Sequence, residues 1–376
     1  MASIFFFGSL RDRTLLEVVL DRPVADADIL PAHVPDRATV KISDEEYPQL
    51  VTQVGGSAPG IVVSGLSAED IARLEYYEEA EYGLADIVVE TEAGPFDARY
   101  FASTPKATHA GEPWELAAWE REERCVSIEA ARELMAHIDI TPVERMDEIW
   151  PGIKIRAMMR ARAQTDAPPT DGMRSPHTAA DVESVEIVRP YTRFFAIEDH
   201  RLRHRRFDGG WSEEIVRTAL VSGDAVTVLP FDPVTRQVLL IEQFRAPIFA
   251  RGDPNPWSIE VIAGRIDKEL SDAETARREA REEAGIELGA LEVISRYYSS
   301  PGIAAEYITA FAGRADLSGT GGTFGEPTEH EDIRAFAVPL EAALGAAASG
   351  EINNGPAVLS IYWLGVNADR LCREWG

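Results

Sequence analysis

The sequence predicts two domains of mixed α+β structure, joined by a polar linker. Its 376 residues exceed the usual size of one domain. Residues 164–184 read QTDAPPTDGMRSPHTAADVES, a stretch rich in Pro, Asp, Thr and Ser that lacks apolar periodicity. On both sides of it, strand-like alternation is interspersed with segments of helical period. We therefore expect domains at 1–163 and 185–376, with the linker at 164–184.

The composition is that of a globular and strongly acidic protein. Apolar residues make up 45% of the chain and charged residues 27%, and the formal net charge is −27. Such a charge repels phosphate backbones and argues against nucleic-acid binding. A small anionic substrate remains compatible with it if a metal ion and a few arginines reverse the local field.

Neither a membrane span nor an export signal is expected. No apolar run approaches the roughly 20 residues that a membrane span needs. The apolar stretch Ile4–Phe7 lacks a basic lead and a cleavage site, so it is interpreted as a strand and not as a signal peptide. Cys125 and Cys372 lie far apart and fit neither a disulfide framework nor a zinc site, which indicates a reducing cytoplasm.

The N-terminal half mixes strands with helices. Ser67 can cap a helix, with Asp70 completing a capping box. Thr141 and Pro142 predict the start of a basic helix that ends near Arg162. The other expected elements are strands at Ile4–Phe7 and Gly60–Val63, and a hairpin of Ala85–Glu92 with Phe96–Ala102 that turns at Gly94 and Pro95.

The C-terminal half contains one sharply bounded helix. Ser271 can cap it, Glu274 can reach back to the cap, and Gly285 supplies a left-handed stop. The other expected elements are strands at Val185–Ile197, Ala225–Pro230, Gln237–Glu242 and Ile333–Val338, and a final helix from about Gly355 to Arg373.

Three carboxylates share one face of that helix. Glu279, Glu282 and Glu283 stand at i, i+3 and i+4, a spacing at which like charges destabilise a bare helix. A hard cation would explain them, because Mg²⁺ takes carboxylate oxygens together with substrate phosphates. The alternative is a solvated acidic face flanked by arginines.

The sequence around these glutamates resembles a known motif. Residues Gly264–Ile286, GRIDKELSDAETARREAREEAGI, are similar to the Nudix box: Gly, five residues, Glu, seven residues, Arg-Glu, an apolar residue, any residue, Glu-Glu, any residue, Gly and an apolar residue. One fixed position departs, because Leu270 stands where the family has a glutamate that orients the catalytic helix. Glu269 or Asp272 could take over that contact. The resemblance implies an α/β/α sandwich.

The likeness extends over nearly all of 185–376 and points to the ADP-ribose pyrophosphatase branch of the family. Pro301 follows Gly285 by sixteen residues, which is the spacing that marks this branch. Further similar segments are Phe194-Phe195, Phe231–Pro233, Glu242–Arg245, Trp257–Gly264, Ser300–Gly302, Glu329–Asp332 and Gly350–Asn353. The branch also implies an N-terminal extension of antiparallel strands.

Several roles follow from the resemblance, position by position. The carbonyl of Ala263 and the carboxylates of Glu279 and Glu283 would bind Mg²⁺ or Mn²⁺, Glu282 would assist, and Glu331 would help to hold a further metal ion. Glu329 matches the general base; a flexible loop suits a base that meets water only after substrate binds. Without the resemblance, Glu329 and Glu331 would be interpreted as exposed loop acids.

The resemblance also implies substrate-binding residues. Arg217 and Arg245 are the expected partners of a diphosphate, because a guanidinium can bind it bidentately. Phe194 matches a position that stacks on adenine. The alternatives are surface ion pairs for the arginines and a core position for the phenylalanine. Thr218 stands where the family has an acidic residue, so contacts to the adenosine end are expected to differ.

The N-terminal half resembles a second family. Phe7-Gly8-Ser9-Leu10-Arg11 is similar to the glycine loop of the γ-glutamylcyclotransferase-like (AIG2-like) proteins, and Leu74–Glu78 with Tyr82 is similar to their second segment. This implies a mixed β-barrel with helices, a loop Gly8-Ser9-Leu10 that binds a carboxylate, and Glu78 as acid/base. Phe7 and Glu79 depart from the tyrosine and glycine of the pattern. A retained scaffold that binds a ligand is the alternative.

Mg²⁺-dependent hydrolysis of ADP-ribose to AMP and ribose 5-phosphate is the first functional hypothesis. The alternatives are hydrolysis of another nucleoside diphosphate sugar, and a non-catalytic nucleotide sensor, which would have no need of a base at Glu329. A homodimer through 185–376 is also expected, because strands between Val185 and Leu220 cross to the partner in the family and carry apolar residues such as Phe207 and Trp211. The alternative is a monomer.

Overall fold

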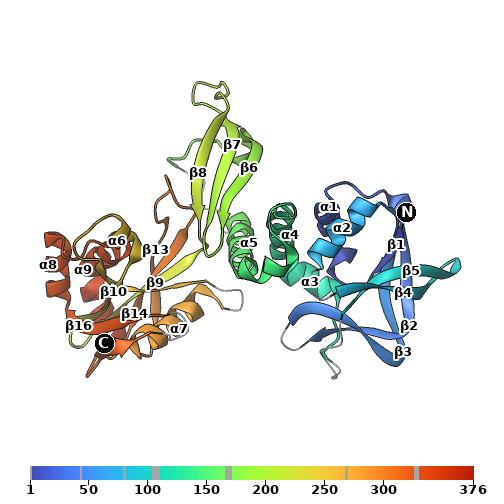
Figure 1. The fold of residues 1–376 in the computed structure, drawn as a ribbon. Coiled ribbons are helices and arrows are strands. Elements are labelled where there is room, and N and C mark those ends of the chain that lie inside the picture. Colours follow the sequence, from blue (N-terminus) through green and yellow to red (C-terminus); the bar gives the residue numbers. More distant parts are fainter. Residues whose placement is uncertain are drawn as a thin grey trace. The chain divides into compact units, whose positions relative to one another are not determined.

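The structure, a computed structural model, describes residues 2–42, 45–78, 82–103, 111–165, 172–266, 270–325 and 330–376. The chain forms two compact units, Met1–Pro169 and Thr170–Gly376, and each is described by itself (Figure 1). The change from one unit to the other falls inside the polar segment 164–184. The domain bounds 1–163 and 185–376 stay a prediction.

The N-terminal unit is built on a closed barrel with the strand order β1-β3-β2-β4-β5. β1 pairs antiparallel with β3 and closes the barrel through a parallel pairing of Ile4 with Arg99 in β5. Closure leaves no open sheet edge, which protects the strands from pairing with other chains. The strands are β1 (Ala2–Phe6), β2 (Ile29–Ile42), β3 (Glu45–Leu66), β4 (Tyr82–Thr91) and β5 (Gly94–Ser103). The expected mixed barrel is confirmed.

Five α-helices of the N-terminal unit accompany the barrel in the described residues. They are α1 (Arg13–Leu20), α2 (Ala68–Tyr77), α3 (Leu116–Glu122), α4 (Arg124–Met135) and α5 (Trp150–Thr165), with short 3-10 helices at Ser9–Arg11, Asp26–Asp28 and Val143–Glu148. The capping box predicted for Ser67 and Asp70 is present at the start of α2. One apolar core joins barrel and helices, with Ile4, Leu74 and Ile153 fully buried in it.

Two local predictions in this unit are wrong. Thr141 and Pro142 do not open the basic helix: Pro142 precedes the 3-10 helix Val143–Glu148, and α5 begins only at Trp150. Pro151 suits this first turn, where the missing N–H is not needed. The hairpin turns at Glu92 and Ala93, two residues earlier than expected, because Thr91 already pairs with Gly94.

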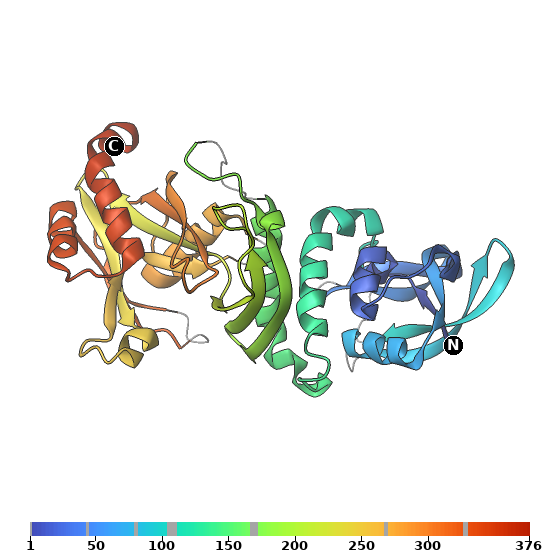
Figure 2. The ribbon, with the colours of Figure 1, turned by 90° about the horizontal axis from the view of Figure 1, so that it is seen from above.

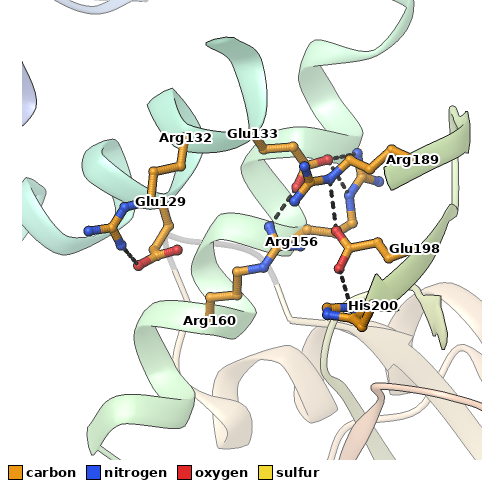
Figure 3. Close-up of polar contacts among 8 residues, drawn as sticks. All are labelled: Glu129, Arg132, Glu133, Arg156, Arg160, Arg189, Glu198 and His200. Atoms are coloured by element: carbon orange, nitrogen blue, oxygen red, sulfur yellow. Dashed lines mark hydrogen bonds and ion pairs between the residues drawn. The ribbon is translucent and has the colours of Figure 1, made fainter. Parts of the chain in front are cut away.

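A buried ion cluster ties α4 to α5 (Figure 3). Arg156 Nε donates to Glu133 Oε1 at 2.8 Å, and Arg160 Nη1 donates to Glu133 Oε2 at 2.5 Å. The Glu133 and Arg156 side chains are both fully buried. On the same helix, Arg132 pairs with Glu129 at 2.6 Å, and the Arg132 side chain is largely exposed. The two pairs therefore differ mainly in their access to water.

The C-terminal unit is an α/β/α sandwich. Its central sheet has eight strands: six run in the order β13-β14-β9-β10-β16-β15, while β11 pairs with β10 and β12 with β9. β14 and β9 are parallel, and the other pairs are antiparallel. The strands are β9 (Ala225–Asp232), β10 (Gln237–Phe244), β11 (Trp257–Glu260), β12 (Ile262–Arg265), β13 (Leu291–Tyr298), β14 (Tyr307–Arg314), β15 (Gly321–Phe324) and β16 (Ile333–Pro339).

Helices cover both faces of this sheet (Figure 1; Figure 2). α7 (Asp272–Ala284) packs on one face, where Ala276, Ala280 and Ala284 join a core with Val226 and Ile262. α8 (Leu340–Ser349) and α9 (Gly355–Trp375) pack on the other face in a second core. A short helix, α6 (Ala246–Ala250), follows β10. The small residues of α7 let it approach the sheet closely.

An antiparallel extension of three strands precedes the sandwich, as expected. It comprises β6 (Val182–Thr192), β7 (Ala196–His204) and β8 (Ile215–Val221), paired in that order. Leu220 connects it to the loop before β14, because its N–H donates to Ile303 and its carbonyl accepts from Ala305. Within the extension, Glu198 is buried and accepts from Arg189 Nε at 2.9 Å, with His200 Nε2 3.0 Å from its second oxygen (Figure 3).

Among the described helices, none has the length and apolar character needed to cross a membrane. Both cysteines, Cys125 and Cys372, are free thiols.

The buried ion cluster generates a stability prediction. Glu133→Gln should lower the free energy of unfolding of the full chain by about 3 kcal/mol, because it removes the negative charge from a fully buried ion pair with Arg156. Urea unfolding followed by circular dichroism measures this. Arg132→Gln is the matched control on the same helix and should cost less than about 1 kcal/mol. Equal losses of unfolding free energy in the two variants would contradict the conclusion that the buried Glu133 cluster contributes more to stability than the exposed pair.

Candidate active site

Local sequence signals fix α7 at both ends. The Ser271 side chain accepts from the Glu274 N–H, and the Glu274 carboxylate accepts from the Ser271 N–H, which completes the predicted capping box. At the other end Gly285 takes the left-handed conformation with φ 64°, and its N–H closes the last turn. The ends of the helix that carries the glutamates are therefore set by its own residues.

Glu279 lies directly over the backbone of β12. A Cβ atom at Gly264 would come within 1.8 Å of Glu279 Oε1, so only glycine leaves room for this carboxylate. The Glu279 side chain is mostly buried and also accepts from Arg278 Nη2 at 2.7 Å. Gly264 thus has a defined structural purpose: it allows a carboxylate of α7 to lie against β12.

Glu283 is the most buried carboxylate of the three, with 2% of its surface exposed. Its Oε2 accepts from the Ala263 N–H at 3.1 Å. Burial raises the pKa of Glu283 well above the ordinary value, and the charges of Glu279 and Glu331 add to the rise. The Ala263 N–H and Arg245 oppose it without cancelling it. Glu283 is therefore a carboxylate whose ionised form needs a further positive charge nearby.

Glu282 differs from the other two carboxylates. It is exposed and accepts from Arg278 Nη1 at 2.8 Å, so Arg278 bridges Glu279 and Glu282. The three glutamates therefore do not share one face as predicted. The carboxylates of Glu279 and Glu283 lie against β12, whereas Glu282 is exposed to solvent. Arg278 partly neutralises the like charges that would otherwise destabilise the helix.

Arg245 lies in the electrostatic field of the same carboxylates. It follows β10 and forms a forked ion pair with the buried Glu260 of β11, with Nη2 to Oε2 at 2.7 Å. Burial lowers the pKa of Arg245, but the hydrogen bonds and charge of Glu260 outweigh it. The charges of Glu283 and Glu331 also raise this pKa. The charges of Arg245 and Glu283 therefore act on each other, and their placement in one substrate site stays a prediction.

The loop before β16 supplies Glu331. This half-buried residue follows His330, whose φ of 57° is left-handed. A Cβ atom at Gly325 would lie 2.8 Å from the Glu331 backbone carbonyl oxygen and Cβ, so the two segments are closely packed. Glu329, the predicted general base, lies outside the described residues. Within the described ranges no three His, Cys, Asp or Glu side chains converge as a metal-binding group.

The departure at Leu270 has a structural counterpart. Leu270 is half-buried, and Glu269 lies outside the described residues. Asp272, in the first turn of α7, accepts from Thr309 Oγ1 of β14 at 2.8 Å, and Thr309 is buried. This hydrogen bond ties the start of α7 to the central sheet. Asp272 therefore provides one contact between the helix and the sheet where the box glutamate is missing.

The predicted adenosine-binding residues lie in the three-stranded extension. Phe194 occupies the turn between β6 and β7 and is 61% exposed, so it is not a core residue. Arg217 lies in β8 opposite His200, exposed, with Nη1 donating to the Val216 carbonyl. Thr218 Oγ1 donates to Asp199 Oδ1 at 2.5 Å. The structure thus places Arg217 on the extension and Arg245 on the sandwich.

The predicted glycine loop of the N-terminal unit follows β1. Gly8 precedes the 3-10 helix Ser9–Arg11, and Leu10 is buried in the barrel core, so only its backbone can face a ligand. A Cβ atom at Gly8 would lie 2.7 Å from Pro48 Cγ. Glu78 is half-buried at the C-terminal end of α2, beside residues 79–81, which lie outside the described residues.

Sequence reasoning missed three charged residues around the carboxylates. These are Glu260, Arg265 and Arg278. Arg278 stands next to Glu279 and at i−4 from Glu282, so its helical spacing was a usable signal. Glu260 has no such signal, because its pairing with Arg245 depends on how β10 and β11 align. Arg265 contacts Phe194, which lies far away in the sequence.

Comparison with known proteins gives matches in both units. Residues 221–358 match the family described as NUDIX domain, and residues 4–121 match the family described as Gamma-glutamyl cyclotransferase, AIG2-like. An ADP-ribose pyrophosphatase of Escherichia coli (strain K12) is 36% identical over 195 residues, which are 52% of this chain and 93% of that protein. A GDP-mannose pyrophosphatase of Yersinia enterocolitica is 32% identical over 158 residues, which are 42% of this chain and 81% of that protein. A solved structure described as "Crystal structure of ADP compounds hydrolase" aligns with a TM-score of 0.37 at 20% identity, covering 52% of this chain and 90% of that one.

The raised pKa of Glu283 predicts how metal-free stability depends on pH. A carboxyl whose pKa is higher in the folded state binds its proton more tightly there, so stability falls as pH rises from the ordinary value of 4.5 toward the raised value. Glu283→Gln keeps an acceptor for the Ala263 N–H and removes the ionisable group, so its stability should not fall with pH for this reason. In EDTA at pH 7 the variant should therefore melt at least about 2 °C above the wild type.

At pH 4, where the carboxyl is mostly protonated in both states, the two proteins should melt at nearly the same temperature. Glu274→Gln, a change in the exposed capping box of the same helix, is the control and should show no such gain at pH 7. A Glu283→Gln protein that melts below the wild type at pH 7 would show that the ionised carboxylate is stabilised in place without metal.

Proposed function

Because this chain belongs to the Nudix family through residues 221–358, with an AIG2-like domain at residues 4–121, we propose that it hydrolyses ADP-ribose to AMP and ribose 5-phosphate. The relative named ADP-ribose pyrophosphatase aligns over 93% of its own length. The observation that carries the proposal is the placement of Glu279 and Glu283 against β12, with Glu283 buried among like charges. A structural helix gains nothing from such a cluster, whereas a hydrolase of diphosphates needs one.

A divalent cation, Mg²⁺ or Mn²⁺, fits this set of residues. Burial and the neighbouring carboxylates disfavour ionised Glu283, and a cation offsets both effects. The donors are all oxygens, which hard cations prefer. The residues that would hold it are Ala263 through its carbonyl, Glu279, Glu283 and Glu331. When bound, the cation would polarise the phosphoryl oxygens and neutralise the charge that develops on them.

The reaction assigns distinct tasks to the residues of this chain. Glu329 takes a proton from the attacking water, whose oxygen forms a bond to one phosphorus while the bond from that phosphorus to the bridging oxygen breaks, so that the bridging oxygen leaves with the other phosphate. Arg245, held by Glu260, carries a positive charge that acts on Glu283 and Glu331 and lowers the repulsion between these carboxylates and an anionic substrate. Glu282 and Arg278 support Glu279 from the solvent side. Phe194 and Arg217 bind the adenosine end.

A second candidate substrate class is another nucleoside diphosphate sugar. The GDP-mannose pyrophosphatase relative shares 32% identity over 81% of its length, so the relatives of this unit are named for more than one nucleotide sugar. Thr218 already differs from the acidic residue expected beside Arg217, and its hydroxyl binds Asp199 instead. Contacts between the three-stranded extension and the nucleoside should therefore decide between ADP-ribose and other nucleoside diphosphate sugars.

A homodimer through the C-terminal unit is supported by the exposed apolar side chains of the extension. In β6 they include Val182, Val185, Ile187 and Val188, each at least 40% exposed, and Phe207 between β7 and β8 is 89% exposed. Covering one large apolar side chain contributes about 1.5–3 kcal/mol. A second copy that pairs with this sheet would cover them and could share Phe194 and Arg217 with its neighbour.

Sedimentation of the full chain tests the dimer, which should have twice the mass of one chain. If the site is shared, mixing an Arg217→Ala protein with a Glu283→Gln protein under exchange conditions should restore part of the activity that neither has alone. A monomer at micromolar concentration that is fully active would exclude the shared site.

A hydrolysis screen tests the proposed function directly. The full chain with Mg²⁺ should turn over ADP-ribose faster than GDP-mannose and other nucleotide sugars, and mass analysis should find AMP and ribose 5-phosphate. Glu329→Gln should lower kcat about a hundredfold or more and change KM little, because it removes the base and leaves binding intact. Glu274→Gln is the control and should stay within about twofold. If Glu331→Gln is the more damaging change, the base has been assigned wrongly.

A further inference from the structure

Glu260 of β11 is a buried carboxylate that depends on Arg245. It is 5% exposed, and Arg245 donates to both of its oxygens, with Nη2 to Oε2 at 2.7 Å. No other donor in the part of the chain that the structure describes bonds to the Glu260 side chain. The Arg245 side chain is 40% exposed, so a ligand can reach it. If Arg245 left Glu260 for an anionic substrate, a buried carboxylate would lose its donors, which is costly.

Two further polar side chains are buried beside this ion pair. Gln243 is 6% exposed and Ser258 is 3% exposed, and they stand directly opposite each other in β10 and β11. Gln243 also pairs with Ile333 of β16, which joins the core beneath α7, so they face the carboxylate helix. Within the described ranges, Gln243 Nε2 and Ser258 Oγ are buried without a hydrogen-bond partner. Such groups are costly and mostly bonded in native proteins.

The strand register places these two side chains between the ends of the ion pair. Arg245 directly follows β10, whereas Glu260 stands opposite Ile241. Gln243 and Ser258 form the cross-strand pair between those positions, on the same face, because alternate residues of a strand share a face. Cβ atoms of neighbours on such a face lie about 4.5–8 Å apart. The Gln243 amide and the Ser258 hydroxyl are therefore within reach of the Glu260 carboxylate.

We propose that Gln243 and Ser258 are positioning residues, which donate to Glu260 when Arg245 turns from this carboxylate to the diphosphate of the substrate. In the structure, Arg245 satisfies Glu260 and leaves the amide and the hydroxyl without a partner. In the complex these two donors replace Arg245, so that Glu260 stays hydrogen-bonded while the guanidinium binds the anion. The inference rests on the proposed function, because it takes the substrate to be a nucleoside diphosphate.

Melting temperatures of the full chain in EDTA test this exchange of donors without a substrate. Gln243→Met removes the amide and keeps a side chain of similar length. It should melt no lower than the wild type, because the amide has no partner there. In an Arg245→Met background Glu260 needs the amide, so the same change should lower the melting temperature by about 3 °C or more. Equal shifts in the two backgrounds would mean that Gln243 has only a packing role.

Steady-state kinetics with ADP-ribose and Mg²⁺ test the role in binding. Gln243→Met should raise KM about tenfold or more with kcat within about threefold, since it weakens binding that ground state and transition state share. Ser258→Ala should act in the same direction. Ser360→Ala is the matched control: its hydroxyl is also buried without a partner in the described chain, but on α9 at the opposite face of the sheet. It should leave both constants unchanged.

The outcomes also separate this inference from the proposed function. If the wild type hydrolyses ADP-ribose but Gln243→Met has the KM of Ser360→Ala, Arg245 binds the substrate without leaving Glu260, and only the inference fails. If the wild type hydrolyses no nucleotide sugar, the proposed function fails, and the role of Gln243 in diphosphate binding fails with it.

Discussion

The burial of Glu283 is the constraint on which the carboxylate site depends. Its carboxylate is 2% exposed, bonds to the Ala263 N–H and faces the charges of Glu279 and Glu331. Burial and like charge both disfavour ionisation. A fold retains such a group where a cation stabilises the charged form, and the surrounding oxygens suit one. Under the proposed function, this arrangement serves a bound cation, at a cost to the stability of the metal-free protein.

The rest of the C-terminal unit holds this arrangement in place. The capping box and Gly285 fix the ends of α7, and small side chains on its inner face let it lie close to the sheet. Gly264 then admits the Glu279 carboxylate. Around the acids, Arg245 and Arg278 restore part of the missing positive charge. These positive charges therefore weaken the negative field of a strongly acidic chain at the proposed site for an anionic substrate.

The sequence predicted what depends on neighbouring residues. Both bounds of α7, the capping box of α2 and the strand character of β1 follow from local signals, and all are present. The two family resemblances extended this to the barrel and the sandwich. What depends on packing was not predictable: helical spacing put Glu282 on a common face with Glu283, yet only Glu283 is buried. The contacts of Arg245 with Glu260 and of Arg265 with Phe194 join segments that meet only in the folded unit.

Metal binding tests the central claim most directly, because it does not depend on which nucleotide is the substrate. Mn²⁺ can be titrated into the full chain and its free concentration followed by electron paramagnetic resonance. The wild type should show saturable binding that is lost in Glu279→Gln and in Glu283→Gln but kept in Glu274→Gln, whose carboxylate only caps α7. Binding that is as tight in Glu283→Gln as in the wild type would contradict the account.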